Sequence, residues 1–116
     1  MQVLIDTLTD LAVLECEGEI VSMEDALRLR YAVMSRRAPV IIMDVTEVTA
    51  IEGEGLEMLS FLRRWTVAHD MRLRLYNPSP SVRARLQQAG CISEITTLDE
   101  MVGLVVDLES VFATAA

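Results

Sequence analysis

The 116-residue sequence contains no lysine, one histidine and few aromatic residues, and these shortages exclude several functions. All ten basic residues are arginines, which excludes a nucleotide-binding P-loop because that motif requires a lysine. Ten basic against 18 acidic side chains give a net charge of −8, which argues against nucleic-acid binding. The two cysteines, Cys16 and Cys91, resemble no metal site in their spacing, and we interpret both as small buried hydrophobic residues.

Long apolar runs are also missing. No uninterrupted apolar segment approaches the roughly 18 residues of a membrane-spanning helix. The first residues, Met1 to Leu4, lack the basic stretch and long apolar segment of a signal peptide. We therefore expect a cytoplasmic protein without direct membrane insertion. The length fits a single domain over residues 1–116, and 52% hydrophobic with 24% charged residues is ordinary for a globular chain.

Strand-like and helix-like patterns alternate along the chain. The expected elements are strands over residues 3–7 and 11–17, a helix over 23–35, a strand over 40–43, a helix over 54–68, a strand over 72–76, a helix after Ser79, a short strand over 92–97 and a helix over 98–111. Strands that alternate with helices form a mainly parallel sheet with helices packed on it. The pattern therefore predicts an α/β fold with about five strands and about four helices.

Capping residues, glycines and prolines mark the expected ends of these elements. Gly18 is expected to end the second strand and Asp44 the third. Ser22 is a good N-cap for the first helix. Pro80 suits the first position of the third helix, and Gly90 is expected to follow its end.

The segment around the second helix is the most informative for function. His69, at the end of that helix, has no serine or cysteine near it in the sequence that suggests a nucleophile–base pair, so we interpret it as a surface or capping residue. A glycine-containing helix start after a buried strand is a natural anion site. Here the chain supplies its own negative charges, Glu52, Glu54 and Glu57. The simplest interpretation is that these acids complement the helix dipole.

Four further segments are similar in their residues, order and spacing to segments of a known protein family. They are Gly18-Glu19-Ile20, Ile42-Met43-Asp44-Val45-Thr46, Arg72-Leu73-Arg74-Leu75-Tyr76-Asn77-Pro78-Ser79 and Gly90-Cys91-Ile92. With them the chain resembles the STAS domain family, named for sulfate transporters and anti-sigma factor antagonists, over nearly all of its residues. The resemblance implies a STAS-like fold.

The functional centre of that family reads Ile-Asp-Ser-Ser-Gly-Leu-Gly at the start of the second helix. In the family, a partner anti-sigma kinase phosphorylates the second serine, and phosphorylation switches partner binding off. The aligned stretch here is 51–57, with Glu52 in place of the aspartate, Gly53 in place of the first serine and Glu54 in place of the phosphorylated serine. The resemblance therefore implies the fold and the partner-binding surface, but not the phosphoryl chemistry.

Two interpretations of Glu54 stay open. A carboxylate carries a permanent charge of −1, against roughly −1.5 to −2 for a phosphoserine, and so imitates part of the phosphorylated state. In the family that state does not hold the anti-sigma factor. The other interpretation is simple divergence, with Glu54 serving only as an acid at a helix start. The hydroxyl groups of Thr46 and Thr49 are alternative positions for phosphorylation by a kinase. Thr49, a weak candidate, lies just before the loop that leads into the second helix.

The resemblance implies a bacterial, non-enzymatic protein-protein interaction module in signalling and transcription regulation, similar to an anti-sigma factor antagonist. The expected contact residues lie around the start of the second helix: Glu52, Gly53, Glu54, Gly55 and Glu57, with the exposed part of the first helix, and Arg63 and Arg64 at the edge. Because this surface is acidic, we expect an anti-sigma factor or another regulatory protein with a basic patch as the partner.

Other functions remain as alternatives. Stand-alone STAS proteins also act as accessory subunits of membrane transport ATPases, and the sequence does not separate this role from the first. A small-ligand or nucleotide binder, using the paired acids Glu52 and Glu54, is the third alternative. We expect neither a cofactor nor a metal, and a homodimer is a further possibility.

Overall fold

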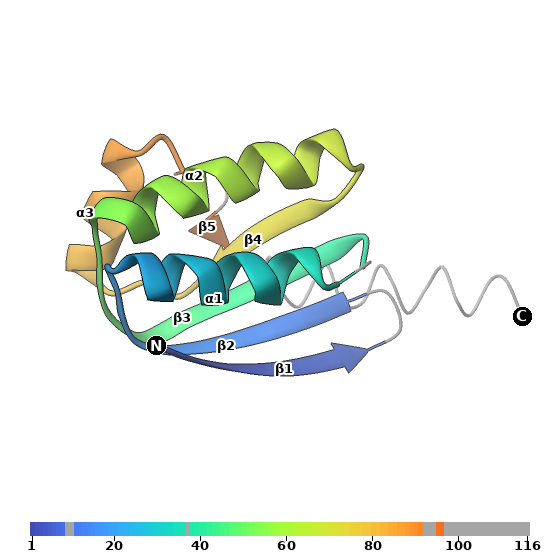
Figure 1. The fold of residues 1–116 in the computed structure, drawn as a ribbon, viewed down its shortest axis with the longest axis horizontal. Helices are drawn as coiled ribbons and strands as arrows, with labels where there is room; N and C mark the ends of the chain where they lie inside the picture. Colours follow the sequence, from blue (N-terminus) through green and yellow to red (C-terminus); the bar gives the residue numbers. More distant parts are fainter. Residues whose placement is uncertain (9–10, 37, 92–94, 97–116) are drawn as a thin grey trace, which may run out of the picture.

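The chain folds into one five-stranded sheet with helices packed on it (Figure 1). The computed structural model describes residues 1–8, 11–36, 38–91 and 95–96. Its elements are β1 (Gln2–Leu8), β2 (Leu11–Ile20), α1 (Met23–Met34), β3 (Val40–Ile51), α2 (Gly53–Ala68), β4 (Arg72–Tyr76), α3 (Pro80–Gln88) and β5 (Ile95–Thr96). The expected helix over 98–111 lies outside the described residues.

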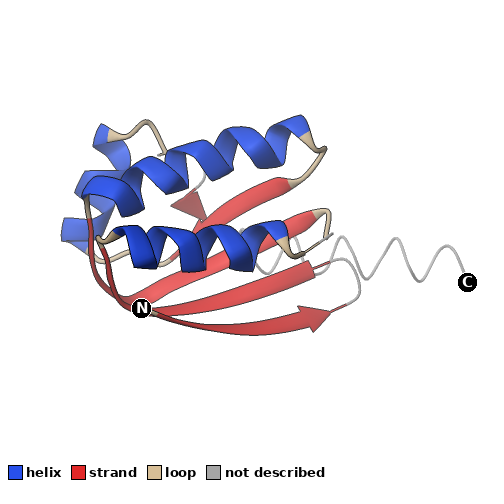
Figure 2. Cartoon of the chain, in the orientation of Figure 1, coloured by secondary structure: helices blue, strands red, loops and turns tan. Residues whose placement is uncertain are grey.

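The strands follow one another across the sheet in the order β1-β2-β3-β4-β5. β1 is antiparallel to β2, and all the other neighbours are parallel. This arrangement confirms the predicted α/β fold with a mainly parallel, mixed sheet. α1 and α2 lie side by side over one face, and α3 lies at the end of the sheet where α2 begins (Figure 2).

The core lies between the sheet and the helices. Its largest fully buried side chains come from three strands and all three described helices: Leu14, Ile20, Leu29, Ile41, Met43, Ile51, Leu59, Leu62, Leu75 and Leu86. A smaller cluster of Leu11, Val40 and Ile42 is buried separately from this core. Residues 40–43 are therefore all buried, which confirms that this strand is covered on both faces.

Two predicted strand ends were wrong. β2 continues past Gly18 to Ile20, and β3 continues past Asp44 to Ile51. The strands stay paired to their ends, but β3 carries an extra residue against β2 at two places, so the register shifts twice. Such bulges bend and twist a strand without ending it. Gly18, with a φ of +87°, takes the left-handed backbone conformation beside the second shift.

The start of α1 is closed by a reciprocal capping box. Ser22 Oγ accepts a hydrogen bond from the Asp25 backbone N–H (3.2 Å), which confirms the predicted N-cap. Asp25 Oδ2 accepts in return from the backbone N–H groups of Ser22 (3.2 Å) and Val21 (3.3 Å). Because these backbone bonds favour the charged carboxylate, they lower the pKa of Asp25 to about 2.

The Asp25→Asn substitution is expected to lower the free energy of unfolding, and this loss should be largest above pH 4. The folded-state pKa lies below the ordinary 3.8, so the charged carboxylate stabilises the fold above that pH. This contribution is lost as the pH falls through 3.8 towards about 2. In urea unfolding at several pH values, the difference between wild type and Asp25→Asn should shrink across this window. A difference that stays constant with pH would contradict the assignment.

Candidate functional site

α2 begins where β3 leaves the sheet beside the end of β2. The Glu52 backbone N–H donates to the Ile20 carbonyl (3.2 Å), so the chain is still held to β2 at the residue before the helix. Gly53 then takes a φ of +53°, in the left-handed region that favours glycine. The backbone N–H groups of Gly55 (3.1 Å) and Leu56 (3.3 Å) donate to the Glu52 carbonyl and open the helix.

Gly55 lets the helix start approach the sheet more closely than any side chain allows. It is buried, and a Cβ at this position would lie 2.2 Å from the Ile20 carbonyl oxygen and 2.6 Å from its carbonyl carbon. Both are backbone atoms of β2, so no side-chain rotation relieves the contact. Among the five expected contact residues, Gly55 therefore faces inward and positions the others.

The remaining expected contact residues lie on the surface. Glu52, Gly53, Glu54 and Glu57 are all exposed. Glu54 and Glu57 form no ion pair within the residues that the structure describes. Glu54, in the first turn of α2, therefore lies at the positive end of the helix dipole, and no basic side chain of the described residues forms an ion pair with it. The structure thus brings the predicted acids together at one helix start.

Glu52 has a different environment from Glu54 and Glu57. It makes no side-chain cap to α2, and its Oε1 instead accepts from Arg85 Nη2 of α3 at 3.3 Å. Both side chains are about half exposed, so the ion pair contributes little stability but ties the two helix ends together. Sequence reasoning missed this contact because the two residues lie 33 positions apart and nothing local indicates it.

A small hollow lies between this ion pair and the end of β3. Thr49, Glu52, Ser81 and Arg85 contribute its polar lining, and its volume is about 170 Å³. Small-molecule sites usually measure about 300–1,000 Å³, so the hollow is small for a nucleotide. Thr49, a weak phosphorylation candidate from the sequence, is exposed and borders this hollow.

The neighbouring hydroxyl of Thr46 is engaged in a hydrogen-bonded cluster. Thr46 Oγ1 donates to Asp44 Oδ1 (2.6 Å) and accepts from Asn77 Nδ2 (3.2 Å). The Thr46 backbone N–H also donates to the same Asp44 oxygen (3.0 Å). Because the hydroxyl uses its donor and one acceptor position, we assign it a structural role in joining the middle of β3 to the residue that follows β4.

The other polar residues of α2 lie away from its start. Arg63 is partly buried, and its Nη1 donates to the Gly90 carbonyl (3.1 Å), whereas Arg64 is exposed. His69 is the exposed C-cap of α2, as the sequence predicted. Its ring stacks on Trp65 with centroids 4.3 Å apart. The arrangement gives this histidine a capping position and no nucleophile to activate.

Metal-ligating side chains do not gather in the described residues: nowhere do three of histidine, cysteine, aspartate or glutamate form a candidate site. Among the helices of the described ranges, none has both the length and the apolar character needed to cross a membrane.

Thiol reagents are expected to leave the native protein unmodified. Cys16 and Cys91 are both buried, as predicted, and burial, with a smaller effect from Asp44, raises the pKa of Cys16 to about 12. Only the thiolate reacts, so we expect native labelling at least ~100-fold slower than in urea. Absorbance of a chromogenic disulfide reagent measures both rates. Native labelling at the unfolded rate would contradict the buried positions.

Comparisons with known proteins identify a matching family and solved structures with a similar fold. The STAS domain family model matches residues 2–108. The anti-sigma factor antagonist SpoIIAA in its unphosphorylated form is 20% identical, with 91% of this chain and 97% of that chain covered and a TM-score of 0.75. A sulfate transporter family protein from Wolinella succinogenes is 18% identical, with 88% and 92% covered and a TM-score of 0.72.

A third similar structure is RsbS from Moorella thermoacetica, in a form that carries a serine-to-glutamate substitution. It is 15% identical, with 95% of this chain and 99% of that chain covered and a TM-score of 0.69. No curated protein matched the sequence. At these identities the solved structures show a shared fold, while the family match extends over nearly the whole sequence. The chain therefore belongs to the STAS domain family.

Proposed function

We propose that this chain is a non-enzymatic interaction module that binds a regulatory protein through the start of α2, in the manner of an anti-sigma factor antagonist. The observation that carries the proposal is the exposed pair of carboxylates, Glu54 and Glu57, on a helix start fixed to the sheet. The similarity to SpoIIAA, whose name describes it as an anti-sigma factor antagonist, supports the same class of partner.

The rigidity of the helix start favours binding. Gly53 and Gly55 set the backbone path, and the Glu52–Arg85 ion pair connects the helix start to α3. A surface already held in its bound conformation loses little conformational freedom on association. The exposed acids then select a partner with basic residues and accelerate the encounter.

Glu54 is the residue on which regulation depends. It occupies the position where the family resemblance implies a phosphorylated serine, and its charge is permanent. We propose that binding at this site is therefore not switched by phosphorylation of residue 54. The RsbS structure, which is similar in fold, also carries a glutamate in place of a serine.

Capture from a native bacterial extract tests the proposal. Immobilised wild type should retain a regulatory protein that the Glu54→Lys variant does not. Glu17→Lys is the matched control, because Glu17 is an exposed glutamate on β2, away from α2, and changes the net charge equally. Equal capture by all three proteins would remove the start of α2 from the interface.

A transport role is the second candidate function. The similarity to a sulfate transporter family protein favours it, since the two chains cover 88% and 92% of each other. In that case the protein retained in the same capture experiment would be a subunit of a transport ATPase. The start of α2 remains the proposed contact surface in both cases, so the Glu54→Lys comparison applies unchanged.

A further inference from the structure

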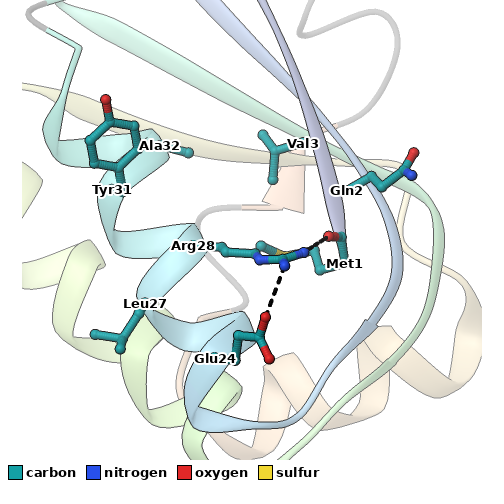
Figure 3. A pocket seen from close by; sticks show the side chains of 8 residues that line it. All are labelled: Met1, Gln2, Val3, Glu24, Leu27, Arg28, Tyr31 and Ala32. Carbon is teal, nitrogen blue, oxygen red and sulfur yellow. Dashed lines mark hydrogen bonds and ion pairs between the residues drawn. The ribbon is translucent and has the colours of Figure 1, made fainter.

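The outward side of α1 carries a row of exposed apolar side chains. Met23, Leu27 and Tyr31 follow one another at four-residue spacing, and they are exposed by 51%, 50% and 75%. Leu27 and Tyr31 point away from β1 (Figure 3), and with Arg30 and Met34 they border a hollow of about 450 Å³ along α1. Exposed apolar surface that gathers in one place marks an interaction site.

This row begins beside the acidic start of α2. α1 and α2 lie side by side, and both begin at the same end of the sheet (Figure 1). A Cβ on Gly53 would lie 3.7 Å from the carbonyl oxygen of Val21, two residues before Met23, so the two helix starts adjoin. Along α2, Phe61 follows Glu54 by seven residues, on the same face, and is 41% exposed. Apolar side chains of both helices therefore continue the surface that starts at the acids.

Charge on this surface is negative at the helix starts. Beside the row, Arg28 Nη2 contacts Glu24 Oε1 at 2.9 Å, so this pair contributes no net charge (Figure 3). Arg30 lies in the middle of α1, away from the start of α2. At the start of α2, Glu54 and Glu57 form no ion pair within the described part of the chain. A partner that covers both areas therefore meets an apolar row with free carboxylates at one end.

We infer that the regulatory partner covers the row Met23, Leu27 and Tyr31 with an amphipathic helix that carries basic residues at one end. The inference rests on the proposed function, because it extends the contact at the start of α2 onto α1. Residues four apart form a ridge along a helix, and ridges of this kind on two helices interdigitate in the commonest class of helix packing. The row spans eight residues, or about 12 Å, which matches about two turns of a second helix.

This placement assigns a separate task to each part of the surface. The apolar side of the partner helix packs on Leu27 and Tyr31 and supplies affinity by burying apolar area. Its basic end meets Glu54 and Glu57, which sets its direction along α1 and accelerates the encounter. The mode is that of an amphipathic helix read by apolar anchors at three- and four-residue spacing.

Calorimetry with the protein that wild type captures tests the inference. Leu27→Glu and Tyr31→Glu should each weaken binding at least tenfold, although both add a negative charge that attracts a basic partner. Val67→Glu is the matched control, because Val67 is a 71% exposed apolar residue near the end of α2, far along the helix from its acidic start. All three side chains are exposed, so each variant should retain the native circular dichroism.

The contact on α1 and the contact on α2 can fail separately. If both α1 variants bind as tightly as wild type while Glu54→Lys does not, the inference is overturned and the proposed function stands. If the α1 variants lose affinity while Glu54→Lys binds as wild type does, the proposed contact at the start of α2 is refuted, and the basic end of the helix with it. A wild type that retains no protein overturns both.

Hydrogen exchange measured on the captured protein identifies the segment that binds. That segment should be helical, with apolar residues at three- and four-residue spacing and with lysine or arginine at one end, and its amides should gain protection in the complex. The same amides should lose this protection when Leu27→Glu replaces wild type. Protection of an extended or acidic segment instead would overturn the inference.

Discussion

Replacing Gly55 with alanine is expected to lower the free energy of unfolding by about 2–3 kcal/mol. The added Cβ would lie 2.2 Å from the Ile20 carbonyl oxygen. That carbonyl also accepts the Glu52 backbone N–H, and the Ile20 side chain is fully buried, so neither can move without breaking core contacts. The helix start must therefore shift away from β2. Urea unfolding at neutral pH measures the loss.

Gly90→Ala is the matched control for this substitution. Gly90, unlike Gly55, has a positive φ, of +75°, and a Cβ there would meet nothing within 4 Å. Only the left-handed backbone strain remains, which costs about 1 kcal/mol. An equal loss for Gly55→Ala and Gly90→Ala would show that the close approach of α2 to β2 contributes no more than backbone conformation.

Reversing the charge of Glu54 is expected to weaken partner binding tenfold or more, about 1.4 kcal/mol. Glu54 is exposed and lies at the positive end of α2 without an ion pair in the described residues. A lysine there would repel a basic partner that the wild-type carboxylate attracts. Calorimetry with the captured partner measures the change, and the wild-type affinity should fall as salt is added.

Glu54→Ser separates imitation of the phosphorylated state from a direct contact made by this carboxylate. If the charge imitates the phosphorylated state, the serine variant should bind an anti-sigma factor more tightly than wild type. If the carboxylate is itself a contact, the serine variant should bind less tightly. Glu17→Lys controls for net charge, since it lies on β2. Equal affinities for wild type, Glu54→Ser and Glu54→Lys would contradict both the imitation and the contact, and would leave Glu54 as an acid that only complements the helix dipole.

Local sequence rules predicted the element order and several element ends. Ser22 and Ser79 cap their helices, and Pro80 opens α3, because capping depends on residues within one turn. Apolar and acidic residues alternate along β2, which is typical of a strand with one solvated face, and Glu15 and Glu17 are indeed exposed. These features needed no knowledge of distant parts of the chain.

Features that depend on distant contacts were not predictable from the sequence. The extension of β3 beyond Asp44 depends on continued pairing with β2, with two shifts of register. The close packing of Gly55 depends on the Ile20 carbonyl, and the Glu52–Arg85 ion pair joins two helices. The sequence therefore indicated which acids lie around the start of α2, but not what holds them in place.

Amide hydrogen exchange on the complex with the captured partner tests the central claim most directly. If the partner binds the start of α2, the amides of residues 53–59 should become protected from exchange in the complex. The amides of β2 around Glu17 should not. Protection confined to other surfaces, with the α2 start exchanging as in the free protein, would contradict the account.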